Sequence, residues 1–188
     1  MKKIFLLFAV FALVTARADQ LGPDIRITPA RGWIAEDTRP AGQPAPAFPT
    51  LRYAPKDGRN ASIIITLFPS NAAGFKVANH ASLERFNLLS AQPYLSGQDE
   101  EPPPVVLDIP NGIGVCITNE DPALVGKPVP PGEYRIATSA SLLLAGKYLV
   151  HCTIFYDEKD STDYHEALGI LLSAKVRPLG ADAPSTNL

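Results

Sequence analysis

The stretch 146–175, GKYLVHCTIFYDEKDSTDYHEALGILLSAK, constrains the fold more than any other part of the sequence. Its first half alternates with the period of a strand, and the residues predicted on one face are Tyr148, Val150, Cys152, Ile154 and Tyr156. After an acidic turn the spacing becomes helical, with an apolar stripe of Tyr164, Ala167, Leu168, Leu171 and Leu172. A strand followed directly by an amphipathic helix needs a sheet on which that helix can pack.

The ends of this helix are also marked in the sequence. Asp163 precedes Glu166 by three residues and follows Ser161, an order typical of a capped helix start with an acidic first turn. Lys175 suits the negative end of the helix dipole, and Pro178 cannot continue the helix. We therefore expect one helix between Asp163 and Lys175.

The rest of the chain reads mainly as short strands separated by turn residues. Strands are predicted at residues 24–28, 51–54, 61–68, 105–109, 113–118, 134–144 and 147–156. A helical period covers residues 76–92 and ends at Pro93, whereas proline-rich segments 39–49 and 98–104 are predicted loops. Short turns between consecutive strands predict an α+β fold, a twisted, mainly antiparallel sheet with two helices packed on it.

The first 18 residues have the pattern of a signal peptide. Lys2 and Lys3 precede an apolar run at 4–14, and the small residues Ala16 and Ala18 suit a cleavage site. That run is shorter than the roughly 20 residues needed to span a bilayer, so we expect no membrane span in the mature chain. We predict cleavage after Ala18, a single domain at 19–178, a disordered tail at 179–188, and a periplasmic or extracellular location.

Charge and motifs exclude several classes of function. The chain carries a net charge of −2 with its Lys and Arg residues scattered, which predicts no nucleic-acid partner. It contains no Gly-x-Ser-x-Gly, His-Glu-x-x-His, Cys-x-x-Cys or phosphate-loop motif. We therefore expect no cofactor.

Two short motifs and the order of the elements resemble a known family. Pro29, Gly32 and Trp33 follow the first strand, and ALGILLSAK at 167–175 forms the last helix. This arrangement resembles the PsbP-like domains, which share an α/β/α sandwich with the Ran-regulator Mog proteins. The resemblance implies a non-catalytic binding or accessory domain whose partner is another envelope or secreted protein, and it supplies no catalytic residue. The alternatives are a small cysteine- or metal-dependent enzyme and a structural envelope component.

Cys116 and Cys152 are the only cysteines, and export would permit a disulfide between them. Cys116 alternates with the large apolar residues of its strand, whereas Cys152 lies on the apolar face of its own strand. If both apolar faces point the same way, the two sulfur atoms lie on opposite sides of the sheet. We expect free, buried thiols in preference to a bridge.

The enzymatic alternative has two versions. Cys116 could share a face with His151 and form a nucleophile–base pair, although buried packing is the commoner role for such residues. Asp157, Asp160 and Asp163 could bind a hard cation such as calcium, although a solvated turn is again the commoner explanation.

Aromatic residues supply the candidate binding surface. Trp33 could stack on a ligand or anchor the core. Tyr134, Tyr148 and Tyr156 could line one edge of the last hairpin as a partner-binding surface, or simply pack within the fold.

Overall fold

The computed structural model describes residues 18–36, 47–70, 76–95 and 102–177. The predicted signal peptide up to residue 17, the predicted tail, most of the predicted loop at 39–49 and part of that at 98–104 lie outside these ranges. Within them, no helix is long and apolar enough to cross a membrane.

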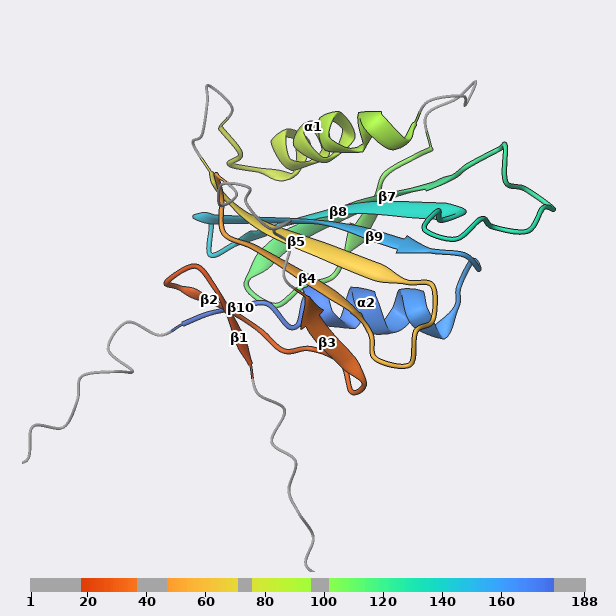
Figure 1. The fold of residues 1–188 in the computed structure, drawn as a ribbon. Coiled ribbons are helices and arrows are strands. Elements are labelled where there is room, and N and C mark those ends of the chain that lie inside the picture. Colours follow the sequence, from red (N-terminus) through yellow and green to blue (C-terminus); the bar gives the residue numbers. More distant parts are fainter. Residues whose placement is uncertain (1–17, 37–46, 71–75, 96–101, 178–188) are drawn as a thin grey trace, which may run out of the picture.

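Seven strands form one antiparallel sheet at the centre of the molecule (Figure 1). In spatial order they are β3 (Trp33–Glu36), β4 (Thr50–Pro55), β5 (Ser62–Pro69), β9 (Tyr148–Tyr156), β8 (Ile136–Leu144), β7 (Gly112–Glu120) and β6 (Val105–Leu107). Neighbours are mostly consecutive in the chain, and short turns join β6 to β7 and β8 to β9. The exception is the pairing of β5 with β9, which brings the last long strand into the middle of the sheet.

The β8–β9 hairpin is the longest local unit of the sheet. The two strands pair along their whole length and turn at Ala145 and Gly146, as the sequence predicts. Both residues have positive φ, 51° and 64°, and the pairing of Leu144 with Tyr148 leaves residues 145–147 in the turn.

One helix covers each face of the sheet (Figure 1). Helix α1 (His80–Ala91) begins with a capping box between Asn79 and Ser82, and it is followed by the short 3₁₀ helix η2 (Gln92–Tyr94), which contains Pro93. On the other face, helix α2 (Thr162–Leu172) is capped by Ser161 and carries Asp163 in its first turn, as predicted. The prediction of an α+β fold with a mainly antiparallel sheet and two helices is therefore confirmed.

Helix α2 buries a slightly different stripe from the predicted one, and helix α1 buries a polar residue. In α2, Ile170 is buried and Leu172 is 39% exposed, so Leu172 does not belong to the apolar stripe. In α1, Leu83, Asn87 and Ala91 face the sheet, whereas Leu89 is 55% exposed. A buried asparagine has no place in a purely hydrophobic pattern, and for that reason the sequence did not indicate it.

A second, three-stranded sheet joins the two ends of the domain. Its strands are β1 (Asp19–Leu21), β2 (Ile25–Ile27) and β10 (Lys175–Val176). Only β2 was predicted, because its two isoleucines alternate, whereas β1 and β10 have no such apolar alternation. Ser173, at the end of α2, receives a hydrogen bond from the backbone N–H of Thr28 and donates one to its carbonyl, which fastens the end of the helix to the start of the domain.

Candidate functional site

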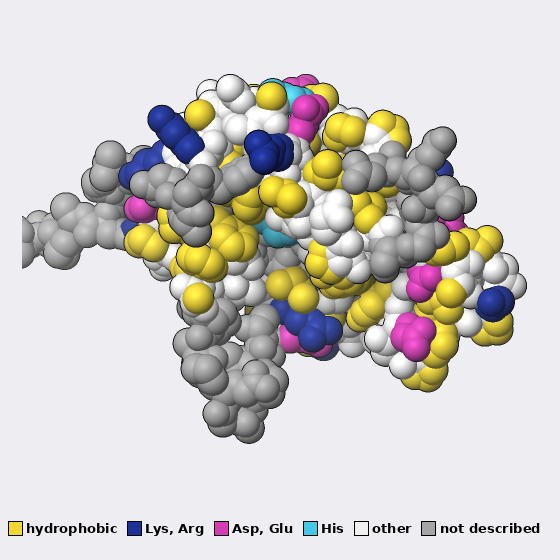
Figure 2. Space-filling model, turned by 90° about the horizontal axis from the view of Figure 1, so that it is seen from above, with side chains coloured by type: hydrophobic (Ala, Val, Ile, Leu, Met, Phe, Trp, Pro, Cys, Tyr) yellow, Lys and Arg dark blue, Asp and Glu magenta, His cyan; other side chains and the backbone are white. Residues whose placement is uncertain are grey.

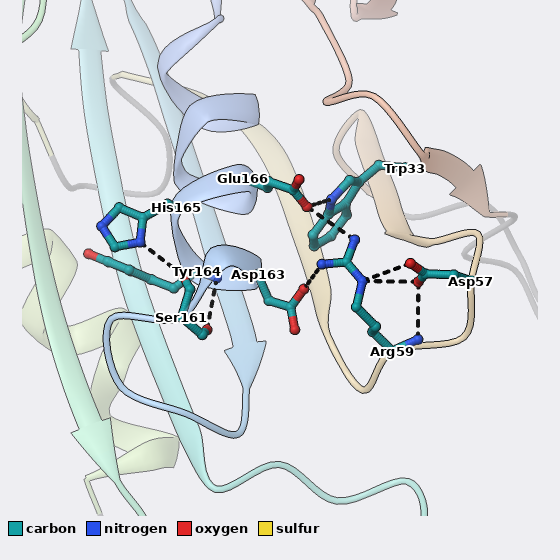
Figure 3. Close-up of polar contacts among 8 residues, drawn as sticks. All are labelled: Trp33, Asp57, Arg59, Ser161, Asp163, Tyr164, His165 and Glu166. Atoms are coloured by element: carbon teal, nitrogen blue, oxygen red, sulfur yellow. Dashed lines mark hydrogen bonds and ion pairs between the residues drawn. The ribbon is translucent and has the colours of Figure 1, made fainter.

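Trp33 is part of the core rather than a ligand-stacking surface. Its side chain is only 4% exposed, and its indole N–H donates to Glu166 Oε2 on α2 at 2.9 Å (Figure 3). Because β3 is an edge strand, this bond ties the sheet edge to the helix below it. The suggestion that Trp33 stacks on a ligand is therefore wrong.

Arg59 joins the β4–β5 turn to the first turns of α2 (Figure 3). It forms ion pairs with Asp57, Asp163 and Glu166. The hydrogen bond from Arg59 lowers the pKa of Asp57. Partial burial raises the pKa of Asp163 even though the Arg59 charge opposes that shift. These contacts fasten the hairpin to the helix.

The three predicted metal ligands do not converge. Asp157 accepts hydrogen bonds from Asn60 Nδ2 at 2.8 Å and from the Arg135 backbone N–H at 3.2 Å. Asp163 pairs with Arg59 instead, and Asp160 occupies a turn position with φ of 55°. In the described part of the chain, no group of three or more His, Cys, Asp or Glu side chains could hold a metal ion.

The two cysteines lie on the same face of the sheet, which corrects the prediction of opposite faces. Cys116 is in register with Ala140, and Ala140 is in register with Cys152 on the far side of β8. The prediction failed because β7 is covered on both faces, with Val115 packed in the α1 cluster and Cys116 in the α2 core. Two strand spacings of about 4.8 Å separate the thiols, which is too far for a disulfide. Both are free and buried.

His151 lies on the opposite face from Cys116, so the proposed nucleophile–base pair is wrong. It contacts Ser141 Oγ through Nδ1 at 3.0 Å and packs against the rings of Phe68 and Phe86. Ser141 in turn donates to Asn87 Oδ1 of α1 at 2.8 Å. Burial lowers the pKa of His151 to about 4. The group is a buried polar contact between helix and sheet.

The three predicted tyrosines do not share a surface. Tyr148 and Tyr156 occupy opposite ends of β9, and Tyr156 is 2% exposed and stacks on Tyr164. Tyr148 donates to Asp24 Oδ2 at 2.8 Å and lines an apolar hollow of about 430 Å³ beside Phe68. Tyr134 lies elsewhere, so the predicted common edge is wrong.

Tyr134 lines a polar and aromatic hollow of about 390 Å³, called here the aromatic pocket. Its lining side chains are Pro93, Tyr94, Asn119, Asp121, Leu124, Glu133, Tyr134, Arg135, Ala137 and Phe155. Figure 2 views the molecule from the α1 side and shows acidic side chains next to apolar ones at its right-hand end, the end toward which residues 121–135 project in Figure 1.

The floor of the aromatic pocket follows from the register of the sheet. Phe155 of β9 is in register with Ala137 of β8, and Ala137 is in register with Asn119 of β7. All three share the face that α1 covers, at the end beyond that helix. Tyr94 of η2 meets the ring of Phe155 edge-on, with 5.6 Å between centroids, and Tyr134 lies 5.2 Å from Phe155 at an angle of 31°.

Arg135 holds the wall of the aromatic pocket in place. Its guanidinium donates to the carbonyl oxygens of Leu124, Lys127 and Asp157 at 3.2, 2.6 and 3.2 Å. Asp121 Oδ1 accepts the Ala123 N–H at 2.8 Å and shapes the start of the same segment. These hydrogen bonds within the chain fix the shape of the pocket wall, and binding sites for small molecules usually have such a fixed shape.

Asn119 is the unusual residue of the aromatic pocket. Its side chain is 6% exposed, and Nδ2 donates to the carbonyl oxygen of Tyr94. Oδ1 is buried and has no hydrogen-bond partner among the described residues. Leaving a buried acceptor unpaired costs about 1–3 kcal/mol. The amide cannot be flipped to escape this cost, because Oδ1 would then face the Tyr94 carbonyl.

Sequence reasoning found only Tyr134 of this pocket. The alternation of β9 places Phe155 on the face of His151, opposite the more apolar face that carries Val150 and Ile154. Tyr94 and Asn119 gave no signal, since their roles depend on a strand register that the sequence does not show.

No protein-family model matches the chain, and no curated protein matches it in sequence. The chemistry of the aromatic pocket must therefore be inferred from its geometry.

Proposed function

We propose that this protein is an exported, non-catalytic binding domain of PsbP-like type, whose ligand or partner segment binds in the aromatic pocket. The observation that carries the proposal is the preformed pocket itself, which combines three partly buried rings with an unpaired acceptor at Asn119. A few polar groups in an otherwise apolar concave site are typical of ligand binding.

Two arguments support the type of domain and its location. One helix on each face of a mainly antiparallel sheet agrees with a PsbP-like sandwich, although such an arrangement also occurs in other folds. Export rests on the sequence alone, on Lys2, Lys3 and the apolar run that follows them. The partner is then another envelope or secreted protein, or a small molecule of that compartment.

The non-catalytic role is supported by the placement of the reactive groups. Cys116 and Cys152 are buried, and burial raises the pKa of both thiols, which disfavours the nucleophilic thiolate. His151 contacts Ser141, whose hydroxyl is fully buried and bonded to Asn87. A substrate could not reach that hydroxyl without opening the core.

The proposal is tested on the chain 19–188 with a panel of amines, carboxylic acids, amino acids, sugars and short peptides. Binding is followed through NMR shifts of backbone amides, with Tyr134→Leu as the pocket variant and Tyr148→Leu as the control at the opposite end of β9. We expect at least one class to shift the amides of Asn119, Tyr134 and Phe155, and to bind more weakly to Tyr134→Leu only.

Other outcomes count against the proposal. A panel in which nothing binds more tightly than about 1 mM, roughly −4 kcal/mol, would mean that the aromatic pocket is not a binding site. Turnover of any panel member that is lost in both Cys116→Ser and His151→Ala would instead establish the enzymatic alternative.

A further inference from the structure

The geometry points to an alkylammonium group as the chemical feature that the aromatic pocket recognises. This inference rests on the proposed binding function and adds the class of ligand to it. It comes from the polarity of the groups that line the pocket, taken together with the aromatic rings.

The first argument is the unpaired acceptor. Asn119 lines the pocket, and its Oδ1 is buried and lacks a donor among the described residues, whereas Nδ2 of the same side chain already donates to the carbonyl oxygen of Tyr94. A ligand that reaches this atom must therefore bring an N–H or O–H group. A ligand with acceptors only, such as a phosphate, would meet an oxygen lone pair at this position.

The second argument is the set of rings. Tyr94, Tyr134 and Phe155 are partly buried. The ring centroids of Tyr134 and Tyr94 lie 5.2 and 5.6 Å from that of Phe155. Aromatic faces carry negative electrostatic potential and attract cations within about 6 Å of a ring centroid. A ligand cation with an alkyl chain can contact ring faces and apolar wall residues together.

The third argument is the charge of the pocket. Asp121 and Glu133 line it, and the one basic side chain of the lining is Arg135. The Arg135 guanidinium donates to three backbone carbonyl oxygens, so it is committed to the wall rather than to a ligand. The lining thus carries two carboxylates against one cation, and its unpaired hydrogen-bonding atom is also negative in character.

All three features favour a positively charged hydrogen-bond donor, and a primary ammonium ion satisfies all of them. It has three donors, a positive charge and an alkyl stem that suits the apolar walls. Two sources provide such a group in an exported compartment, a free diamine and a lysine side chain of a partner protein. Both sources present the same ammonium group, and separate probes distinguish the free diamine from the lysine side chain.

The experiment uses the chain 19–188 and three probes of matched size. 1,4-Diaminobutane represents a free diamine, N-acetyl-lysine methylamide represents a lysine side chain, and N-acetyl-norleucine methylamide has the same backbone and alkyl chain without the charge. Dissociation constants come from titration calorimetry, and amide shifts at Asn119, Tyr134 and Phe155 locate the site.

Three variants and a control test the named groups. Glu133→Gln removes a charge from an exposed position that should not affect folding, Tyr134→Leu removes a ring, and Asn119→Leu removes the unpaired acceptor. Glu158→Gln makes the same charge change on an exposed residue of the β9–α2 turn, outside the lining of the pocket.

We expect at least one ammonium probe to bind at least about tenfold more tightly than the norleucine derivative, a difference of 1.4 kcal/mol. Glu133→Gln and Tyr134→Leu should each weaken that binding about three- to tenfold, and Glu158→Gln should leave it unchanged. Binding should also weaken at high salt. A preference for the lysine derivative or for the diamine identifies the source.

Three results would overturn the inference. If the norleucine derivative binds as tightly as the ammonium probes, the pocket recognises apolar shape, and the binding function stands without the cation. If neither ammonium probe binds while another class of the panel binds in a Tyr134-dependent way, only the ammonium inference fails. If neither the ammonium probes nor any member of the panel binds, the proposed function fails as well.

Discussion

His151, which packs between the sheet and α1, makes a quantitative prediction about the pH dependence of stability. Its contacts are neutral, with Ser141 at Nδ1 and the rings of Phe68 and Phe86 around it. Because burial disfavours the charged imidazolium, the pKa of His151 falls from 6.5 to about 4 in the folded protein. The unfolded chain therefore binds a proton at a higher pH than the folded chain does.

The size of the effect follows from these two pKa values. Above pH 6.5 the imidazole is neutral in both states and the histidine imposes no penalty. As the pH falls below 6.5, only the unfolded state gains the proton, so the free energy of unfolding decreases by about 2 kcal/mol at pH 5 and about 3 kcal/mol at pH 4. Below the folded pKa the penalty stays constant.

The test compares the parent with His151→Asn, whose amide can still donate to Ser141 but cannot titrate. Urea unfolding is measured from pH 4 to pH 7.5, and the difference in free energy of unfolding between the two proteins is plotted against pH. The lost ring contacts lower the stability of the variant at every pH, so the readout is the change in the difference and not its absolute value.

We expect the parent to lose about 2 kcal/mol more than His151→Asn does between pH 7 and pH 5. Parallel curves for the parent and His151→Asn would refute the reasoning, because they would mean that His151 titrates alike in the folded and unfolded states.

Three further predictions concern stability and the thiols. Trp33→Phe removes the indole donor to Glu166 and should lower the free energy of unfolding by about 2 kcal/mol, more than Glu166→Gln, which keeps an acceptor; a urea midpoint that does not move would contradict the anchoring role. Ala145→Asn should raise the free energy of unfolding by about 0.5–1 kcal/mol, because asparagine tolerates the positive φ of this turn, whereas Ala145→Val should lower it. Thermal unfolding measures both variants, and a Val variant more stable than the Asn variant would contradict this explanation. Cys116 and Cys152 should react with a thiol reagent only after denaturation, and reductant should leave the melting temperature unchanged; a decrease with reductant would reveal a disulfide.

Much of the architecture could be predicted from periodicity. Strands β4, β5, β8 and β9 lie within a residue or two of their predicted bounds, because each carries a run of β-branched and apolar residues between turn signals. Helix α1 was predicted four residues too early, since Val77 continues the apolar pattern but precedes the capping box at Asn79. The short strands β3 and β10 were missed, because their pairing depends on distant segments.

The candidate site could hardly be predicted at all. The sequence indicates Tyr134 as a candidate partner-binding residue, but only in a group with Tyr148 and Tyr156, which lie elsewhere. The aromatic pocket depends on the register that aligns Phe155 with Ala137 and Ala137 with Asn119. Alternation along one strand gives the two faces of that strand, but it does not say which residue lies opposite on the next.

The sequence by itself determined which segments are strands and helices, where the hairpins turn, and that the fold is α+β with a mainly antiparallel sheet. These properties are local, because they follow from side-chain periodicity and turn chemistry within about ten residues. Only the tertiary structure decided that both cysteines share a face, that His151 lies on the opposite face, and that Asn119 bonds to Tyr94 through Nδ2 while its Oδ1 has no partner among the described residues. Those outcomes depend on strand register and on coverage of both faces of the sheet, which arise only when distant segments pack together.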